Sequence, residues 1–170
     1  MSTIPTTTDD ERRAARARVL DAVRPILDAA KAERFDAGLA ARMERVWPTD
    51  GAPARALAAL LADLRARGAI GERENEGVRF SRVKKAESDD DFSIDFVHMS
   101  GPGPGHVHPK GELDLCFAVS GAPRFDGRAP GFTSYEAGTW HVPTVTGGAM
   151  DILYFLPAGA ITFGPDPRAA

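Results

Sequence analysis

The sequence lacks several features that would place it in a class at once. It holds one cysteine, Cys116, in 170 residues, so no disulfide can form within the chain and a reducing compartment is expected. No apolar run is long enough to cross a bilayer. The opening residues, MSTIPTTTDDERR, have neither the basic start nor the apolar centre of a signal peptide. Together these absences predict a cytoplasmic protein outside the membrane.

A strong excess of either charge is also missing. The formal net charge is -3 at pH 7, which argues against a general binder of nucleic acid or of anionic membranes. No G-x-G-x-x-G motif is present, so nothing indicates a dinucleotide cofactor. With 43% hydrophobic and 26% charged residues, the composition is that of a globular protein with an ordinary core.

Apolar residues at helical spacing open the chain after a tail expected over residues 1–7. Thr8 and Glu11 have the spacing of a capping box, in which each side chain satisfies a free amide at the start of a helix. Pro25 lies inside the apolar pattern that follows. Because proline removes a hydrogen bond and crowds the preceding turn, we expect it to kink or split this helix.

Two further helices are predicted before residue 72. Phe35, Leu39 and Met43 indicate a second helix that ends at Trp47-Pro48. Asp50 is placed to cap a third helix with a leucine stripe, and Gly68 suits the position just after its end.

The helices followed by GERENEGVRFSRV, residues 71–83, could form a winged helix that binds DNA. Residues 1–72 carry about as many basic as acidic side chains, whereas a DNA-reading domain usually has a clear basic excess. A helical flank that packs on the rest of the protein is therefore favoured.

From residue 78 onward, short β-rich runs alternate with glycine and proline. Such a pattern is typical of an antiparallel sandwich or barrel. We therefore expect an α+β protein with an N-terminal helical region at 1–72 and a β-barrel domain at 73–170. The predicted strands are 78–84, 92–99, 105–109, 112–119, 123–126, 132–136, 139–143, 150–156 and 160–164.

Three of the four histidines and one glutamate form a pattern typical of a metal site. His106 and His108 flank Val107 and would share one face of a strand. A turn at residues 109–111 would bring Glu112 back to that face, and His141 follows downstream. Imidazole and carboxylate suit first-row divalent ions, with Fe(II) or Mn(II) first and Zn(II), Ni(II) or Co(II) as alternatives.

These residues resemble the two signature motifs of the cupins, which are double-stranded β-helix jelly rolls. The resemblance implies one ion held by His106, His108, Glu112 and His141. The motifs depart from the cupin pattern at three loop or strand positions, which puts strand register in doubt more than ligation: Val119, Glu136 and Val145.

A narrower resemblance rests on HVHPKGELDLCF, TWHVPTVTGG and ILYFLPAGAITF. These stretches, after helices of this kind, look like 4-hydroxylaminobenzoate lyase and its relatives. That family implies conversion of 4-hydroxylaminobenzoate to 3,4-dihydroxybenzoate (protocatechuate) with release of ammonia, in bacterial nitroaromatic degradation.

A lyase of this kind needs acid–base groups and a cation for the benzoate carboxylate. Glu112 and Asp114 are the candidate catalytic groups, since strand alternation sends Asp114 to the same interior face. His98 is interpreted as a partly buried histidine or one that lies behind the ligands, not as a ligand, and Cys116 as a small packed residue, not a nucleophile. Arg82 is the first choice for the carboxylate because its guanidinium can hold it in two hydrogen bonds. The further candidate substrate-binding residues are Lys110, Tyr154 and Trp140.

Two other functions remain open from sequence. One is a cupin dioxygenase that uses Fe(II) and oxygen on a small aromatic or thiol substrate. The other is a non-enzymatic cupin that senses a small molecule. Leu113, Leu115 and Phe117 would point outward from the barrel and need a cover, either the helices or a second subunit. A homodimer is accordingly expected, with no nucleic-acid or membrane partner.

Overall fold

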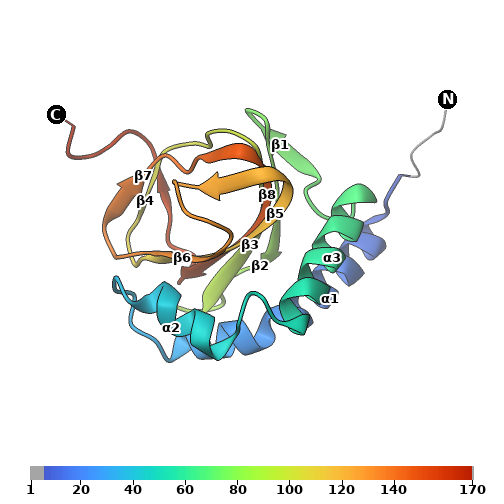
Figure 1. The fold of residues 1–170 in the computed structure, drawn as a ribbon, viewed down its shortest axis with the longest axis horizontal. Helices are drawn as coiled ribbons and strands as arrows, with labels where there is room; N and C mark the ends of the chain where they lie inside the picture. The colour runs from blue at the N-terminus through green and yellow to red at the C-terminus, as the bar shows by residue number, and fades with distance from the viewer. Residues whose placement is uncertain (1–5, 170) are drawn as a thin grey trace.

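The computed structural model describes residues 6–169, so most of the expected tail lies outside the described residues. Three helices come first and run along one side of the strands (Figure 1). They are α1 (Asp9–Lys31), α2 (Leu39–Val46) and α3 (Ala52–Ala66). The strands are β1 (Arg73–Asn75), β2 (Val78–Lys84), β3 (Phe92–Met99), β4 (His106–His108), β5 (Glu112–Phe125), β6 (Gly131–Tyr135), β7 (Thr139–His141), β8 (Val145–Pro157) and β9 (Thr162–Phe163).

The helix ends follow the predicted chemistry in most places. Thr8 and Glu11 form the capping box of α1, with Glu11 N–H donating to Thr8 Oγ1 over 3.2 Å. The helix continues through Pro25 without splitting. The predicted cap at Asp50 is wrong: Gly51 occupies the N-cap of α3 with an extended backbone, and no side chain caps that helix. Gly68 follows α3 with φ +70°, the left-handed conformation that favours glycine.

Two antiparallel sheets face each other as a jelly roll. The larger has the order β1-β2-β3-β8-β5-β6, and the smaller has the order β7-β4-β9. In Figure 1, β4 and β7 lie across the interior from β8 and β5. This is the cupin-type architecture predicted from the sequence. The segments 112–119 and 123–126, expected as two strands, belong to the single long β5.

The irregularities of β5 explain that difference. Its pairing with β8 shifts register between Ala118 and Ser120 and again between Gly121 and Arg124. The first shift spans Val119, one of the positions that depart from the cupin pattern. A bulge inserts an extra residue and bends the strand without ending it.

The helices cover the outer face of the large sheet. Leu113 and Leu115 of β5 are fully buried in one core with Val23 and Ile26 of α1 and Leu61 of α3. The predicted outward apolar row is therefore covered within the chain. The homodimer stays a prediction, but it no longer follows from an uncovered row.

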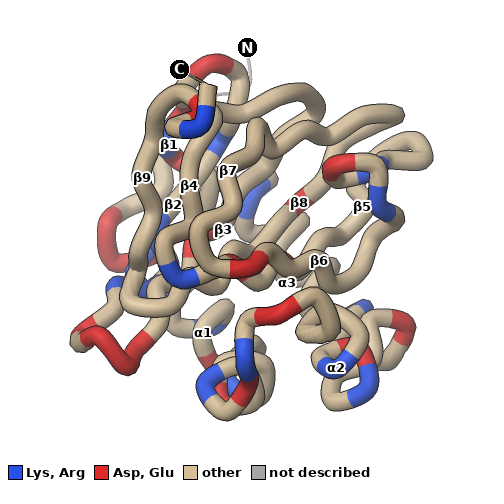
Figure 2. The backbone as a smooth tube through the Cα atoms, turned by 90° about the vertical axis from the view of Figure 1, so that its left-hand side faces the viewer, with Lys and Arg blue, Asp and Glu red and all other residues tan. Residues whose placement is uncertain are grey.

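The winged-helix alternative does not match this arrangement. β1 and β2 form a hairpin that joins the large sheet through β3. On the helices, basic and acidic residues are mixed along the chain (Figure 2). Several arginines pair with an acid three or four positions away, such as Arg13 with Asp10 and Arg67 with Asp63. A phosphate-binding strip would instead leave its arginines available. Across residues 6–169, no helix combines the length and apolar character of a membrane span.

Candidate metal centre and adjoining cavity

The three histidines of the predicted site come from the small sheet. β4 buries His106 and His108, while Val107 between them is partly exposed. β7 pairs with β4 so that His141 is the cross-strand neighbour of His106. The Nε2 atoms of His106 and His141 lie 3.2 Å apart.

Glu112 reaches the same point from the large sheet. The predicted turn is present, and Gly111 N–H donates to the carbonyl of His108 over 3.2 Å. Gly111 has φ +89°, and a Cβ there would lie 2.8 Å from the carbonyl oxygen of Tyr135. Only glycine suits this position. Glu112 Oε2 lies 2.8 Å from His108 Nε2 and 3.7 Å from His106 Nε2.

These four side chains fit a metal ion. One ligand atom from each lies within 4.8 Å of the others. His108 Nε2 and both carboxylate oxygens of Glu112 are buried without a well-formed hydrogen bond to any described residue. Buried polar atoms normally have partners, so acceptors that converge in this way indicate a cation between them. The site links the two sheets, since its histidines lie in one and Glu112 in the other.

The outer nitrogens of two histidines are already engaged. His106 Nδ1 lies 3.0 Å from the carbonyl of Pro104. His141 Nδ1 lies 2.6 Å from Asp126 Oδ2. Tyr135 also hydrogen-bonds Asp126 through its hydroxyl. The sequence did not indicate Asp126 or Tyr135, because both reach the site only through strand pairing.

Asp114 is fully buried next to Glu112 on the interior face, as strand alternation predicted. Burial first, and then the charge of Glu112, raise the pKa of Asp114 well above its usual value. Burial also raises the pKa of Glu112, but the His106 and His108 rings outweigh it, so the net direction is downward.

Cys116 continues the same face and is buried. Burial, followed by the charge of Asp114, raises the pKa of its thiol well above the usual range. A thiol of this kind is an inert packing group.

A cavity of about 450 Å³ opens beside the four candidate ligands, which are called the metal cluster below. His106 forms part of its wall, together with Arg82 of β2, Asp95 of β3 and Tyr154 of β8. Arg82 and Asp95 form an ion pair. Burial raises the pKa of Asp95, and Arg82 partly offsets that rise. The rest of the wall includes Val78, Phe80, Val97, Met99, Leu156, Ile161 and Phe163.

A row of polar residues crosses the interior face of the large sheet. Arg82 pairs in register with Asp95, Asp95 with Tyr154, and Tyr154 with Asp114. Thr133 of β6 is the next cross-strand neighbour. Side chains in register on one face are close neighbours. The row therefore runs from the cavity wall to Asp114, which lies next to the candidate ligand Glu112.

Two predicted substrate residues lie elsewhere. Lys110 is exposed in the turn after β4. Trp140 lies between Thr139 and His141 on β7, and its Nε1 donates to the carbonyl of Gly164 over 2.9 Å. Neither belongs to the cavity wall. His98 is outside the cluster as predicted, with Nδ1 2.7 Å from Asp151 Oδ1.

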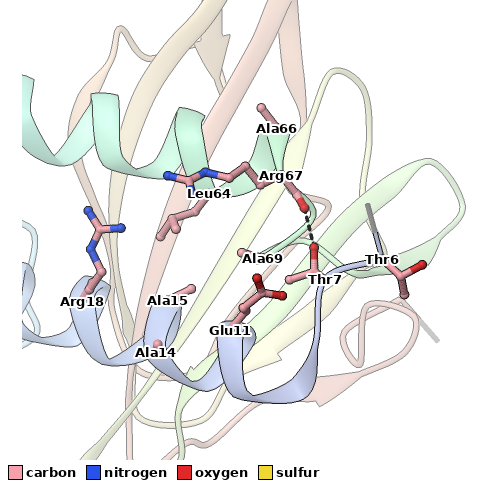
Figure 3. Close-up of a pocket in the computed structure, with 10 residues that line it drawn as sticks. All are labelled: Thr6, Thr7, Glu11, Ala14, Ala15, Arg18, Leu64, Ala66, Arg67 and Ala69. Atoms are coloured by element: carbon pink, nitrogen blue, oxygen red, sulfur yellow. Dashed lines mark hydrogen bonds between the residues drawn. The ribbon is translucent and has the colours of Figure 1, made fainter. Parts of the chain in front are cut away.

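A second cavity, of about 470 Å³, lies between the start of α1 and the end of α3 (Figure 3). Its charged wall residues include Glu11, which belongs to the capping box, and Arg67, which pairs with Asp63. Alanines and Leu64 form much of the remainder. No histidine or cysteine lines it in the described part of the chain. The His/Glu cluster lies beside the first cavity, at His106, and not beside this one.

Solved structures show partial similarity to the chain. An RmlC-like cupin protein from Ralstonia eutropha JMP134 superposes with a TM-score of 0.42 at 17% identity, covering 54% of this chain and 62% of its own. The polyketide cyclase RemF from Streptomyces resistomycificus gives a TM-score of 0.37 at 17% identity, covering 54% and 76%.

Sequence comparison is more specific. A 4-hydroxylaminobenzoate lyase from Nocardioides sp. (strain LMS-CY) is 33% identical over 107 residues, 56% of this chain and 63% of its own. The enzyme of that name from Pseudomonas putida is 31% identical over 88 residues, 42% of this chain and 50% of its own. The match thus spans less than two thirds of either relative. The family model PnbB, 4-hydroxylaminobenzoate lyase, matches residues 21–163. The chain belongs to the 4-hydroxylaminobenzoate lyase family.

Proposed function

We propose that the protein is a metal-dependent lyase that converts 4-hydroxylaminobenzoate to 3,4-dihydroxybenzoate and ammonia. The observation that carries the proposal is that His106 is both one of the four candidate metal ligands and part of the cavity wall. A small aromatic molecule in this cavity would lie directly against the cluster. Family membership and the names of the two relatives support the same reaction.

Three imidazoles and one carboxylate would hold the ion, and Fe(II) or Mn(II) suits this ligand set best. An ion with these four protein ligands keeps open positions when its coordination number is higher than four. When bound, it supplies Lewis acidity that polarises the N–O bond and lowers the pKa of a coordinated water.

Arg82 is proposed to hold the carboxylate of the substrate. Its side chain is 42% exposed although Asp95 already pairs with it. A guanidinium has five N–H donors in a planar fork, so it can bind a second carboxylate while keeping the first. Neighbouring strands are about 4.8 Å apart. The polar row from Arg82 to Asp114 therefore spans a distance on the order of 10–15 Å, enough for a para-substituted ring between the two ends.

The reaction consumes one water overall and needs no external oxidant or reductant. The N–O bond breaks and its oxygen leaves as water. A second water adds to the ring carbon next to the one that bears nitrogen, and hydrolysis of the resulting imine releases ammonia. Glu112 is proposed to accept a proton from the incoming water when its carboxylate is not held as a ligand. Glu112 and Asp114 are both fully buried, and neither lines the cavity. Asp114, its neighbour on the interior face of β5, is proposed to exchange that proton with Glu112.

The test is an anaerobic assay of the metal-loaded protein with 4-hydroxylaminobenzoate. Ammonia and 3,4-dihydroxybenzoate should form in equal amounts without oxygen. A requirement for oxygen would replace the lyase with a dioxygenase, and specific retention of DNA without turnover would favour a sensor.

A pair of histidine variants provides the matched control. His141→Ala removes a ligand from the cluster, whereas His98→Ala removes the one histidine outside it. We expect at least about 100-fold loss of activity for the first, because replacing even groups behind the ligands typically costs 10–100-fold. His98→Ala should remain within a few-fold of the parent protein. Full activity in His141→Ala would rule out the metal mechanism.

A further inference from the structure

Asp126 makes three hydrogen bonds at the edge of the metal cluster. Oδ2 accepts from Nδ1 of His141 over 2.6 Å and from the hydroxyl of Tyr135. Oδ1 accepts from the backbone N–H of Thr144 over 2.8 Å. Asp126 therefore connects a candidate ligand to β6 and to the start of β8.

The bond to Asp126 has a chemical consequence for His141. An ionised carboxylate can only accept a hydrogen bond, so the neutral ring carries its hydrogen at Nδ1 and presents a lone pair at Nε2. Nε2 is the atom that lies 3.2 Å from Nε2 of His106, inside the cluster. The same hydrogen bond restrains rotation of the imidazole ring, because it holds Nδ1 against Asp126 Oδ2.

We propose that Asp126 is the positioning residue of the metal centre, selecting the tautomer and orientation of His141 for ligation. Nothing in this role depends on which reaction the centre performs. His106 has the equivalent contact from the carbonyl of Pro104, a backbone group that no substitution removes. The orientation of the His141 ring depends instead on a side chain, that of Asp126, which a substitution can remove.

Tyr135 supports the carboxylate. Its ring packs against His141 with centroids 4.3 Å apart and against His108 with centroids 5.3 Å apart. The guanidinium of Arg128 lies 5.3 Å from the centroid of the same ring. With its hydroxyl on Asp126, Tyr135 limits the movement of two candidate ligands and of the group that orients one of them.

A purely structural role for Asp126 is the competing explanation. The residue has φ +48° and its backbone N–H bonds the carbonyl of Thr144, so it also shapes the loop after β5. A loop-shaping residue would lower the stability of the fold when replaced. A loop-shaping residue would not change metal affinity specifically through the orientation of His141.

The test measures Zn(II) affinity by competition with a chromophoric chelator. We expect Asp126→Asn to weaken binding about 10- to 100-fold, as groups behind metal-bound histidines typically do. In Co(II)-loaded protein, the visible absorption bands should shift because the His141 ring is no longer held. The matched control is Asp151→Asn. Asp151 accepts from Nδ1 of His98 over 2.7 Å in the same way but outside the cluster, so the affinity should not change.

A double substitution separates the two roles. In a His141→Ala background, Asp126→Asn should cause no further loss of Zn(II) affinity, whereas a structural residue would still weaken binding. Tyr135→Phe, which keeps the fold-shaping carboxylate, should weaken binding about three- to tenfold by removing one hydrogen bond. Parent-like Zn(II) affinity in Asp126→Asn overturns the proposal. If that variant does not fold, parent-like affinity in Tyr135→Phe overturns it instead.

Discussion

His106 and His141 turn their Nε2 atoms toward each other across 3.2 Å. Each ring has its Nδ1 next to an oxygen acceptor, Pro104 O for His106 and Asp126 Oδ2 for His141. With the ring hydrogens placed at Nδ1, two lone pairs face one another in a buried site. Such an arrangement is repulsive unless a cation lies between them.

Removal of the metal should therefore lower the thermal stability of the protein. An ion at 100 times its Kd stabilises the folded state by about 2.7 kcal/mol. For a chain of this size, about 1 kcal/mol corresponds to roughly 2–4 °C in Tm. Treatment with a chelator should lower the Tm by several degrees in scanning calorimetry. His106→Ala should have the same Tm with and without chelator, and an unchanged Tm in the parent protein would contradict a buried site.

Arg82→Ala should raise KM more than it changes kcat. Hydrogen bonds to charged groups contribute about 1.5–3 kcal/mol, so KM should rise about 10- to 100-fold. The variant also leaves Asp95 without the partner it now has, which adds repulsion toward a carboxylate. Steady-state kinetics with 4-hydroxylaminobenzoate measure the effect.

The controls for Arg82 use a second residue and a second substrate. Lys110→Ala should leave KM within a few-fold, since Lys110 is exposed and outside the cavity wall. Phenylhydroxylamine has no carboxylate and should lose little affinity when Arg82 is replaced. Equal losses for both substrates would show that Arg82 acts on cavity shape instead of on the carboxylate.

Asp91→Asn should destabilise the protein at neutral pH but not in strong acid. Burial raises the pKa of Asp91, but Lys84 and backbone N–H groups outweigh it and hold the pKa well below its usual value. Lys31 of α1 adds a contact of 3.3 Å. A depressed carboxyl pKa stabilises the folded state above the unfolded value of about 3.9, and the benefit disappears as pH falls through the folded value. Urea unfolding should show a stability gap between parent and variant that narrows below about pH 4. A constant gap would contradict the assignment.

Leu115→Ala should cost about 2–5 kcal/mol in the free energy of unfolding, because Leu115 is fully buried where the helices meet the large sheet. Val119→Ala in the same strand should cost less than about 0.5 kcal/mol, since Val119 is 40% exposed. Denaturant titration of both variants makes the comparison. Similar losses at the two positions would mean that the helices do not cover this face.

Local patterns were sufficient for much of the fold and of the cluster. The capping box at Thr8 and the His106-Val107-His108 alternation depend on spacings of a few residues, so the sequence displays them directly. The outward face of Leu113 and Leu115 follows from the period of two along a strand. The alternation does not say what covers that face, and only the packing shows it to be α1 and α3.

Features that depend on register were not predictable. Asp126 reaches His141 because of how β5 pairs with β8, and the pairing shifts register twice before that point. The N-cap of α3 is Gly51, one residue after the expected Asp50, and propensity alone does not resolve a difference of one residue. Trp140 was expected beside the substrate, but the alternation that turns His141 into the cluster turns the neighbouring indole toward Gly164.

His106 belongs both to the candidate metal site and to the cavity wall, so we expect binding of the metal and binding of an aromatic molecule to be thermodynamically linked. A metal that fixes the His106 ring also fixes that part of the wall, and the affinity for an aromatic molecule should rise with metal loading. Linkage is reciprocal, so a bound aromatic must retain the metal by the same factor. Loss of metal to a chelator should then slow when the substrate or product is present. Protein without metal would bind the aromatic molecule weakly, so that molecule would remain available to metal-loaded protein.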